Sequence, residues 1–327
     1  MVDIFTKFVM WLVPKCLYRN GISEEMLRSF FAHILNPKYV VLNWLMVQSN
    51  DACHDRSVNR YNLLMSLPRN GKYDEELDYC CRHALELTMF PYDRIRDSEC
   101  PHTGVEKGMP FVFHGDKKVF FPARYCCERA ASLYRGFVDE EGILGTGCLR
   151  KHPHSYVTDL FKVDEGDIIL DVGSAEGLFA LDNIERASKV YVFESMKIWR
   201  RPLAATFAAF SNKVSIVNKY VGSKVSRKIT TLDEILKSES EDATYFIKMD
   251  IEGAEREVLC ASESFLTSHR VKLACAVYHR HDDAEFIKAE LERIGFSVEF
   301  SDGYILTSFN DFIYPYFRRG MIYAKNY

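Results

Sequence analysis

The feature that most constrains this chain is the stretch Asp167–Gly177, which reads D-I-I-L-D-V-G-S-A-E-G. Its apolar run, Ile168–Val172, is typical of a strand buried on both faces, and the apolar residues Leu178–Leu181 that follow indicate a helix. Between them, Gly173 and Gly177 predict a tight turn whose backbone can approach a ligand closely. Open α/β sheets bind ligands at the carboxyl ends of their strands. The stretch therefore predicts a nucleotide-type pocket.

The charges of this turn indicate which nucleotide it would bind. A turn that holds the pyrophosphate of a dinucleotide uses free N–H groups, and carboxylates would repel the phosphates. This turn carries Asp171 and Glu176, which would attract the ammonium and sulfonium groups of S-adenosylmethionine (SAM). The charges favour SAM over NAD. Because short glycine patterns arise often by chance, an ordinary strand-to-helix turn is the alternative that this stretch alone leaves open.

Strand-like and helix-like segments alternate along the rest of the chain. We expect strands at 189–193, 214–221, 243–249 and 272–278, and helices at 198–210 (broken near Pro202), 231–236, 255–266 and 283–294. This alternation predicts an α/β fold with a parallel, doubly wound sheet. Three strand-like segments close the chain at 296–300, 304–308 and 319–324. Because no helix separates the last ones, we expect an antiparallel edge.

The region before this sheet has a different pattern. Residues 1–108 read as mainly helical, with a good helix start where Ser23 precedes two glutamates. Residues 109–153 read as a connector with a small β-hairpin, formed by 111–113 and 119–121, and a helix at 128–137. We therefore expect three parts, 1–108, 109–153 and 154–327. The N-terminal helices suit a lid, packing against the main domain, or homo-oligomer formation.

Composition limits the partners and the compartment. The 327 residues carry a net charge of −4, with a pI near 6.2, so we expect no nucleic-acid partner. The apolar stretch Phe8–Val13 is too short to span a membrane. The ten cysteines are scattered and form no C-x-x-C pair, which favours reduced thiols over a disulfide or zinc framework. The expected location is the cytoplasm.

Polar residues recur where the predicted strands end. Glu194 follows the second strand, 23 positions after Asp171 (194 − 171), near the spacing at which an acidic residue reaches a ribose. Asp250 follows the fourth strand, and His279 follows the fifth. Each has an ordinary alternative, namely a solvated carboxylate, a helix N-cap and a satisfied histidine. Since one crevice would collect all of them, their combination favours a functional site.

Several of these segments resemble the FkbM family of SAM-dependent methyltransferases. The resemblance rests on D-V-G-S-A-E-G, the V-F-E strand end, T-L-D-E-I-L and above all I-K-M-D-I-E-G-A-E at 247–255. It covers about His154 to the end of the chain. It implies a Rossmann-like class I methyltransferase sheet of seven strands with the last antiparallel, and O-methylation of a sugar, glycan or secondary metabolite.

The resemblance also implies which residues contact SAM. Asp171, Gly173 and Gly177 would shape the amino-acid end of the site, Glu194 would bind the ribose, and Val221 and Gly222 would lie by the adenine. Ser223 stands where related enzymes often have an acidic residue, so that contact is open. The full set expected to bind SAM is Asp171, Gly173, Ser174, Glu176, Gly177, Glu194, Ser195, Val221, Gly222 and Asp250.

A hydroxyl acceptor must lose its proton, and the sequence offers two bases. His279 is the first choice because a neutral imidazole is available near neutral pH. Asp250 is the second, as base, as orienter of His279 or as a metal ligand. A site of Asp250, Glu252 and His279 could hold Mg²⁺, but Glu252 would point away from Asp250 if both were still in a strand, so the metal-free form is favoured.

The acceptor itself is the least determined part. Tyr316–Arg319 and His152–Tyr156 could border a small-molecule or glycan pocket, and arginines would suit an anionic sugar. Edge-strand packing and a polar connector explain the same residues. Three functions stay open: an O-methyltransferase, an NAD-dependent dehydrogenase, and a non-catalytic protein of the same fold that binds SAM or a partner.

Overall fold

The computed structural model describes residues 64–67, 69, 71–83, 89–93, 101–141, 151–240, 242–306 and 315–327. The chain divides into two compact units, one of Met1–Pro68 and Cys80–Leu87 and the other of Arg69–Tyr79 and Thr88–Tyr327. Nearly all described residues belong to the second unit, which holds every residue of the predicted site. The helix start at Ser23 and the apolar stretch Phe8–Val13 lie outside the described residues. The division at 108 and 153 stays a prediction.

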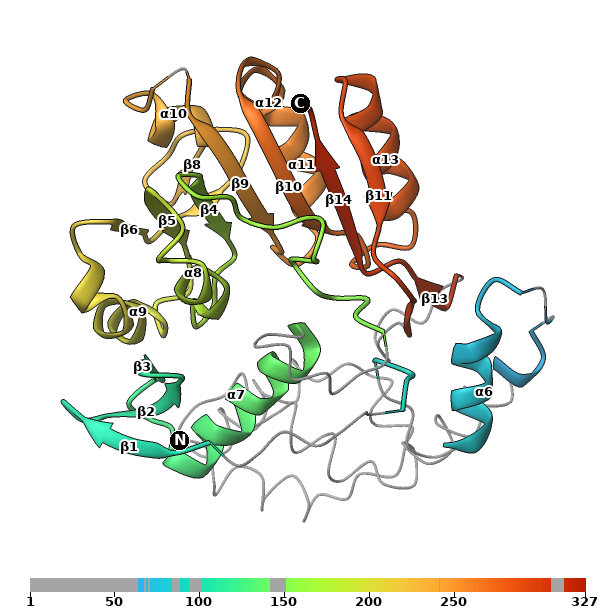
Figure 1. Cartoon of the computed structure of the whole chain (residues 1–327), viewed down its shortest axis with the longest axis horizontal. Helices are drawn as coiled ribbons and strands as arrows, with labels where there is room; N and C mark the ends of the chain where they lie inside the picture. The colour runs from blue at the N-terminus through green and yellow to red at the C-terminus, as the bar shows by residue number, and fades with distance from the viewer. Residues whose placement is uncertain are drawn as a thin grey trace, which may run out of the picture. The chain divides into compact units, whose positions relative to one another are not determined.

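A seven-stranded sheet forms the centre of the second unit (Figure 1). Its order is β11 (Ser297–Phe300), β14 (Met321–Lys325), β10 (Arg270–Ala276), β9 (Thr244–Met249), β4 (Ile168–Val172), β5 (Lys189–Phe193) and β6 (Val214–Val217). From β10 to β6 all neighbours pair in parallel, whereas β14 is antiparallel to both β10 and β11. The predicted Rossmann-like sheet of seven strands with the last antiparallel is confirmed.

Side chains of the central strands belong to two hydrophobic cores, one on each face of the sheet, because successive residues of a strand point to opposite sides. Ile169 packs with α7, α8 and α9, whereas Ile168, Leu170 and Val172 pack with the helices of the other face. The helices of the first core are α7 (Cys127–Glu141), α8 (Leu178–Asp182) and α9 (Arg200–Thr206). Those of the second are α10 (Leu232–Leu236), α11 (Glu255–Ala261), α12 (Glu263–Ser268) and α13 (Asp283–Arg293). The predicted doubly wound architecture follows from these two cores.

The predicted hairpin is part of a three-stranded antiparallel sheet. Strands β2 (Met109–His114) and β3 (Lys117–Phe120) meet at the expected turn, and β1 (Thr103–Glu106) adds a third strand beside β2. The strand β1 escaped prediction because T-G-V-E contains a single apolar side chain, and that side chain, Val105, is exposed. Further upstream, α6 spans Asp74–Arg82.

Several predicted elements are divided differently in the structure. Pro202 is the third residue of α9 and does not break it, since an N–H in the first turn has no helical partner to lose; the chain instead passes into a 3₁₀ turn, η2 (Ala208–Phe210). The predicted third strand is split after Val217, and β7 (Tyr220–Val221) pairs with β8 (Ile229–Thr230) in a separate small sheet. The helix predicted at 255–266 is divided at Ser262, between α11 and α12.

The described part of the segment predicted as a strand at 304–308 does not pair with the main sheet. Its described part contains β12 (Ile305–Leu306), which pairs with β13 (Phe317–Arg318). Within the described ranges, the six cysteines are free, and no helix is long and apolar enough to cross a membrane.

Candidate functional site

The loop after β4, residues 173–177, is tied to the end of the neighbouring strand and is called the donor loop below. The N–H groups of Gly173 and Ser174 donate to the carbonyl of Phe193, at 3.0 and 3.2 Å. Ala175 has a left-handed backbone (φ 46°), and its N–H donates to the Glu194 carboxylate at 3.0 Å. The other oxygen of Glu194 accepts the N–H of Met196. Glu194 therefore holds the donor loop in one conformation from the end of β5.

The two glycines of the donor loop make room for protein. Both have positive φ, at 82° and 84°. A Cβ on Gly173 would lie 1.9 Å from the carbonyl oxygen of Asp250, and a Cβ on Gly177 would lie 2.8 Å from the Phe207 ring. The sequence predicted that both glycines let the backbone approach a ligand. The space beside them instead receives the backbone after β9 and a side chain that follows α9.

Three buried carboxylates surround the donor loop. Asp171 is completely buried, and Glu176 and Glu194 are 3% and 7% exposed. Burial raises the pKa of each of them, that of Glu176 to about 8. The Ser174 hydroxyl beside them has no hydrogen-bond partner in the described structure.

Lys248, on β9, is the cation that faces this group. Its ammonium lies 3.2 Å from Asp171 Oδ1 and donates to the carbonyl of Gly173. Burial opposes the charged form of Lys248, but the carboxylates of Asp171 and Asp250 outweigh it and raise the pKa. Lys248 is one cation beside several acidic side chains, so this group favours a cationic ligand such as SAM.

The predicted adenine side is less complete. Val221 belongs to the same hydrophobic core as Phe193, and the N–H of Gly222 donates to Thr230 of the small sheet. Ser223, where an acidic residue was missing, donates its hydroxyl to Glu257 of α11 at 2.6 Å. An acidic group is therefore present at this position after all, supplied from a distant part of the chain.

Asp250 lies directly after β9 and is the hub of a second polar group. Its N–H donates to Val172 of β4 at 3.0 Å, which keeps it beside the donor loop. Its Oδ2 accepts the Tyr156 hydroxyl at 3.0 Å and lies 3.0 Å from His154 Nε2. Burial favours the neutral acid, but the hydrogen bond from His154 and the charge of Lys248 hold the pKa of Asp250 well below its usual range. Asp250 is therefore a stable carboxylate.

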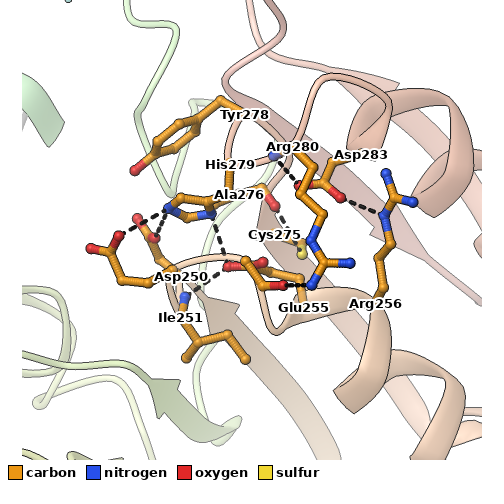
Figure 2. A network of polar contacts seen from close by, with 12 residues as sticks. Asp250, Ile251, Glu255, Arg256, Cys275, Ala276, Tyr278, His279, Arg280 and Asp283 are labelled. Atoms are coloured by element: carbon orange, nitrogen blue, oxygen red, sulfur yellow. Dashed lines mark hydrogen bonds and ion pairs between the residues drawn. The ribbon is translucent and has the colours of Figure 1, made fainter. Parts of the chain in front are cut away.

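His279, after β10, lies between carboxylates on both sides (Figure 2). Its Nδ1 is 3.0 Å from Glu255 Oε1, and its Nε2 is 3.5 Å from Asp250 Oδ1 and 3.7 Å from Glu252. Burial lowers the pKa of His279, but the carboxylates of Glu255, Asp250 and Glu252 outweigh it and raise the pKa. The neutral imidazole on which its selection as a base rested is therefore disfavoured.

The same carboxylates bear on the metal question. Asp250, Glu255 and His279 each offer an atom within 4.8 Å of the others, and they are the one such group found in the described part of the chain. The expected Glu252 is replaced by Glu255, because Glu252 has left the strand, with φ 59° and a side chain that is 93% exposed. The two ring nitrogens of His279 face different carboxylates, which suits a doubly protonated imidazolium better than a metal ligand.

Comparison with known proteins adds a family to this geometry. Residues 197–298 match the family model of the methyltransferase FkbM domain. The resemblance to FkbM methyltransferases is confirmed. The matched segment contains Asp250, Glu255 and His279, whereas the donor loop and Glu194 precede it. No curated protein matches the sequence significantly.

Solved structures resemble about half of the chain. An FkbM methyltransferase from Methylobacillus flagellatus is 18% identical over 51% of this chain and 45% of its own, with a TM-score of 0.42. A precorrin-6y C5,15-methyltransferase from Geobacter metallireducens is 14% identical over 51% of this chain and 82% of its own (TM-score 0.34). A Streptococcus mutans protein described as a methyltransferase and solved with SAH is 17% identical over 50% and 90% (TM-score 0.34).

Sequence reasoning gave no specific role to four members of this site. Lys248 could have been found, because it lies two positions before Asp250 and alternate positions share one face of a strand. His154 and Tyr156 were expected either to border an acceptor pocket or to belong to a polar connector; they are 6% and 5% exposed and contact Asp250. Glu255 was recognised in the motif, and no role was given to it. Its carboxylate accepts the N–H of Ile251 at 2.8 Å and faces His279.

The arginines expected near the acceptor have other partners. The guanidinium of Arg318, which is 4% exposed, donates to the carbonyls of Tyr278 and His279 at 2.9 and 3.2 Å. That of Arg319 lies over the Tyr304 ring, 4.3 Å from its centroid. Arg318 thus fixes the end of β10, as the edge-packing alternative predicts.

Proposed function

We propose that this protein is a SAM-dependent methyltransferase that transfers a methyl group to a hydroxyl of a sugar, glycan or secondary metabolite. The FkbM match supports methyl transfer. One observation carries the choice of SAM: Asp171 is completely buried at the donor loop beside the buried Glu176 and Glu194, and the cation that faces this acidic group in the described structure is Lys248, 3.2 Å from Asp171 Oδ1. A cationic ligand would add a second positive charge beside these acidic side chains.

The residues expected to hold SAM fall into three groups. Asp171, Ser174 and Glu176 would face its charged amino-acid end, with Gly173 and Gly177 shaping the loop. Glu194 and Ser195 would hold the ribose, since each Glu194 oxygen accepts one N–H and retains a second lone pair. Val221 and Gly222 would border the adenine. When bound, SAM supplies an activated methyl carbon, and its sulfur retains the electron pair of the broken carbon–sulfur bond.

The group around Asp250 would prepare the acceptor. The backbone carbonyl of Asp250 packs against Gly173, which places Asp250 next to the donor loop. We propose that Asp250 and His279 orient the acceptor hydroxyl and assist its proton removal. Positioning of the reactants can contribute roughly 7 to 11 kcal/mol, and proton removal about 10² to 10⁴ in rate.

Calorimetry with SAM, SAH and NADH is the first test of this proposal. We expect saturable binding of SAM and SAH and none of NADH. Saturable NADH binding without SAM binding would establish the dehydrogenase alternative and refute the proposal. A cell extract incubated with protein and methyl-labelled SAM, and then examined by mass spectrometry, should contain a labelled ether. SAM binding without any labelled product would favour the non-catalytic alternative.

A further inference from the structure

We propose that His154 accepts the proton of the acceptor hydroxyl, on Nδ1, while Asp250 holds the opposite ring nitrogen. The inference rests on the proposed methyl transfer to a hydroxyl. It assigns one step of that reaction to a residue that lies before the segment matched by the family model.

Asp250 is poorly suited to take the proton itself. Its Oδ2 accepts the Tyr156 hydroxyl at 3.0 Å and lies 3.0 Å from His154 Nε2. Its Oδ1 faces His279 Nε2 at 3.5 Å. Partners of this kind stabilise the carboxylate form. A carboxylate that is stabilised in this way is a weak base, and its contacts suit it to orient the rings beside it.

His279 is also poorly suited. Its Nδ1 is 3.0 Å from Glu255 and its Nε2 is 3.5 Å from Asp250, so each ring nitrogen has a carboxylate to which it can donate (Figure 2). The imidazole satisfies both carboxylates only when both nitrogens carry protons. In that state the ring has no lone pair for the acceptor proton, and it serves as a fixed positive charge.

His154 differs from His279 in one decisive respect. Its Nε2 lies 3.0 Å from Asp250 Oδ2, whereas its Nδ1 is buried and has neither a carboxylate nor another hydrogen-bond partner beside it within the described structure. When Nε2–H donates to Asp250, the neutral ring carries its lone pair on Nδ1. A carboxylate that fixes a histidine tautomer in this way leaves the other nitrogen ready to act as a general base.

The surroundings of the His154 ring are mainly aromatic. The rings of Tyr156 and Tyr278 lie 5.3 Å from it, and that of Phe90 lies 6.0 Å away. The titratable groups that face it are Asp250, from the end of β9, and Glu140 of α7, whose own pKa is raised by burial. Tyr156 and Tyr278 supply the nearby hydroxyls.

The proton step is balanced without another reactant. The O–H bond of the acceptor breaks and its electron pair stays on oxygen, which uses a pair to form the new bond to the methyl carbon. The proton forms an N–H bond at His154 Nδ1, and the resulting imidazolium is stabilised by Asp250. After the ether leaves, the proton passes to solvent.

The tautomer of His154 can be measured without knowing the acceptor. Nitrogen-15 NMR of histidine side chains distinguishes protonated from unprotonated ring nitrogens, and His154→Gln assigns the signals. We expect the His154 ring to carry its proton on Nε2 with Nδ1 unprotonated, and His279 to carry protons on both nitrogens. A proton on His154 Nδ1, alone or together with one on Nε2, would overturn the proposal.

Turnover supplies a second measurement. His154→Gln should lower the rate of label transfer in extract by about 10²-fold or more, while the Kd for SAM changes less than about threefold. The matched control is His114→Gln, which removes another buried histidine, one whose Nδ1 lies 2.9 Å from the Tyr134 hydroxyl; it should transfer at the wild-type rate. Transfer at the wild-type rate by folded His154→Gln refutes the role of His154 alone. Absence of SAM binding by the wild-type protein refutes the proposed function as well.

Discussion

At the scale of single residues, Asp171 offers the clearest test of the donor site. In Asp171→Asn the side chain keeps its shape and loses its charge, so we expect the Kd for SAM to rise at least about tenfold, or about 1.4 kcal/mol. Calorimetry measures this directly. Asp167→Asn is the matched control, because Asp167 is equally buried just before the same strand and pairs with Lys272 at 3.0 Å. It should lower stability and leave SAM affinity unchanged. Equal losses of SAM affinity in both variants would contradict a direct contact between Asp171 and SAM.

Glu176 predicts a proton linked to SAM binding. Burial raises its pKa to about 8, so near pH 7 the free protein carries Glu176 mainly as the neutral acid. A cationic ligand nearby favours the carboxylate and lowers the pKa, so binding should release protons, up to about one per site. Calorimetry at about pH 7 in two buffers of different ionisation enthalpy measures this release. Glu176→Gln should bind SAM with no such buffer dependence. A release that persists in Glu176→Gln would have another origin.

The metal-free form of the site makes its own prediction. Because the two nitrogens of His279 face separate carboxylates, we expect EDTA to leave the rate of label transfer unchanged and Mg²⁺ to have no effect on it. Rates of label transfer are measured on protein that has passed through a chelating column, before and after Mg²⁺ is added. Loss of turnover in EDTA that Mg²⁺ restores would show that Asp250, Glu255 and His279 hold an ion.

Members of the site could be predicted from the sequence where a local pattern marks them. Contacts between residues far apart along the chain could not. Asp171, Glu176 and Glu194 lie next to strand ends, which the alternation of apolar segments marks. The contact of Asp250 with His154 joins residues 96 positions apart, and that of Ser223 with Glu257 joins residues 34 apart. Such contacts depend on tertiary packing, which no local pattern in this one sequence encodes.

At the scale of elements, Gly173 joins the donor loop to the turn after β9. In Gly173→Ala a methyl group would meet the Asp250 carbonyl, and the positive φ adds strain. We expect a loss of about 2 to 5 kcal/mol in unfolding free energy, the sum of a left-handed alanine and an overpacked contact. Gly166→Ala is the control, with φ 87° and nothing near its Cβ, and should lose only about 1 to 2 kcal/mol. Denaturant unfolding of both variants measures the difference, and equal losses would contradict the close contact.

Strands and helices could be predicted from the sequence where their apolar pattern is long. Prediction failed where that pattern is short. The strands β4, β5 and β9 are almost entirely buried, so continuous apolar runs mark them. The strands β1 and β7 have four and two residues, and each includes exposed positions. Short elements of this kind are defined by their pairing partners, which a single-sequence pattern does not contain.

At the scale of the whole molecule, the donor site joins segments from β4, β5 and β9. A ligand held by all three segments should stabilise the cooperative unit that contains them. SAM at 100 times its Kd should add about 2.7 kcal/mol to the unfolding free energy and raise the unfolding temperature with the logarithm of its concentration. Calorimetric scans at several concentrations measure this, and Asp171→Asn is the control: with a tenfold higher Kd, it should gain only about 1.4 kcal/mol at the same SAM concentration. If the unfolding temperature did not change with SAM concentration, SAM would not bind at a site formed by the folded unit.

The position of β14 has a consequence for how the protein is made. This strand lies between β10 and β11, although both of them come earlier in the chain. While the ribosome is still producing the residues between β11 and β14, β10 and β11 have no shared partner, and β10 exposes an unpaired edge. At about 5 to 20 residues per second this interval lasts seconds, long enough for such an edge to pair with another nascent chain or to be bound by a chaperone. The sheet can therefore be completed only after β14 has been synthesised.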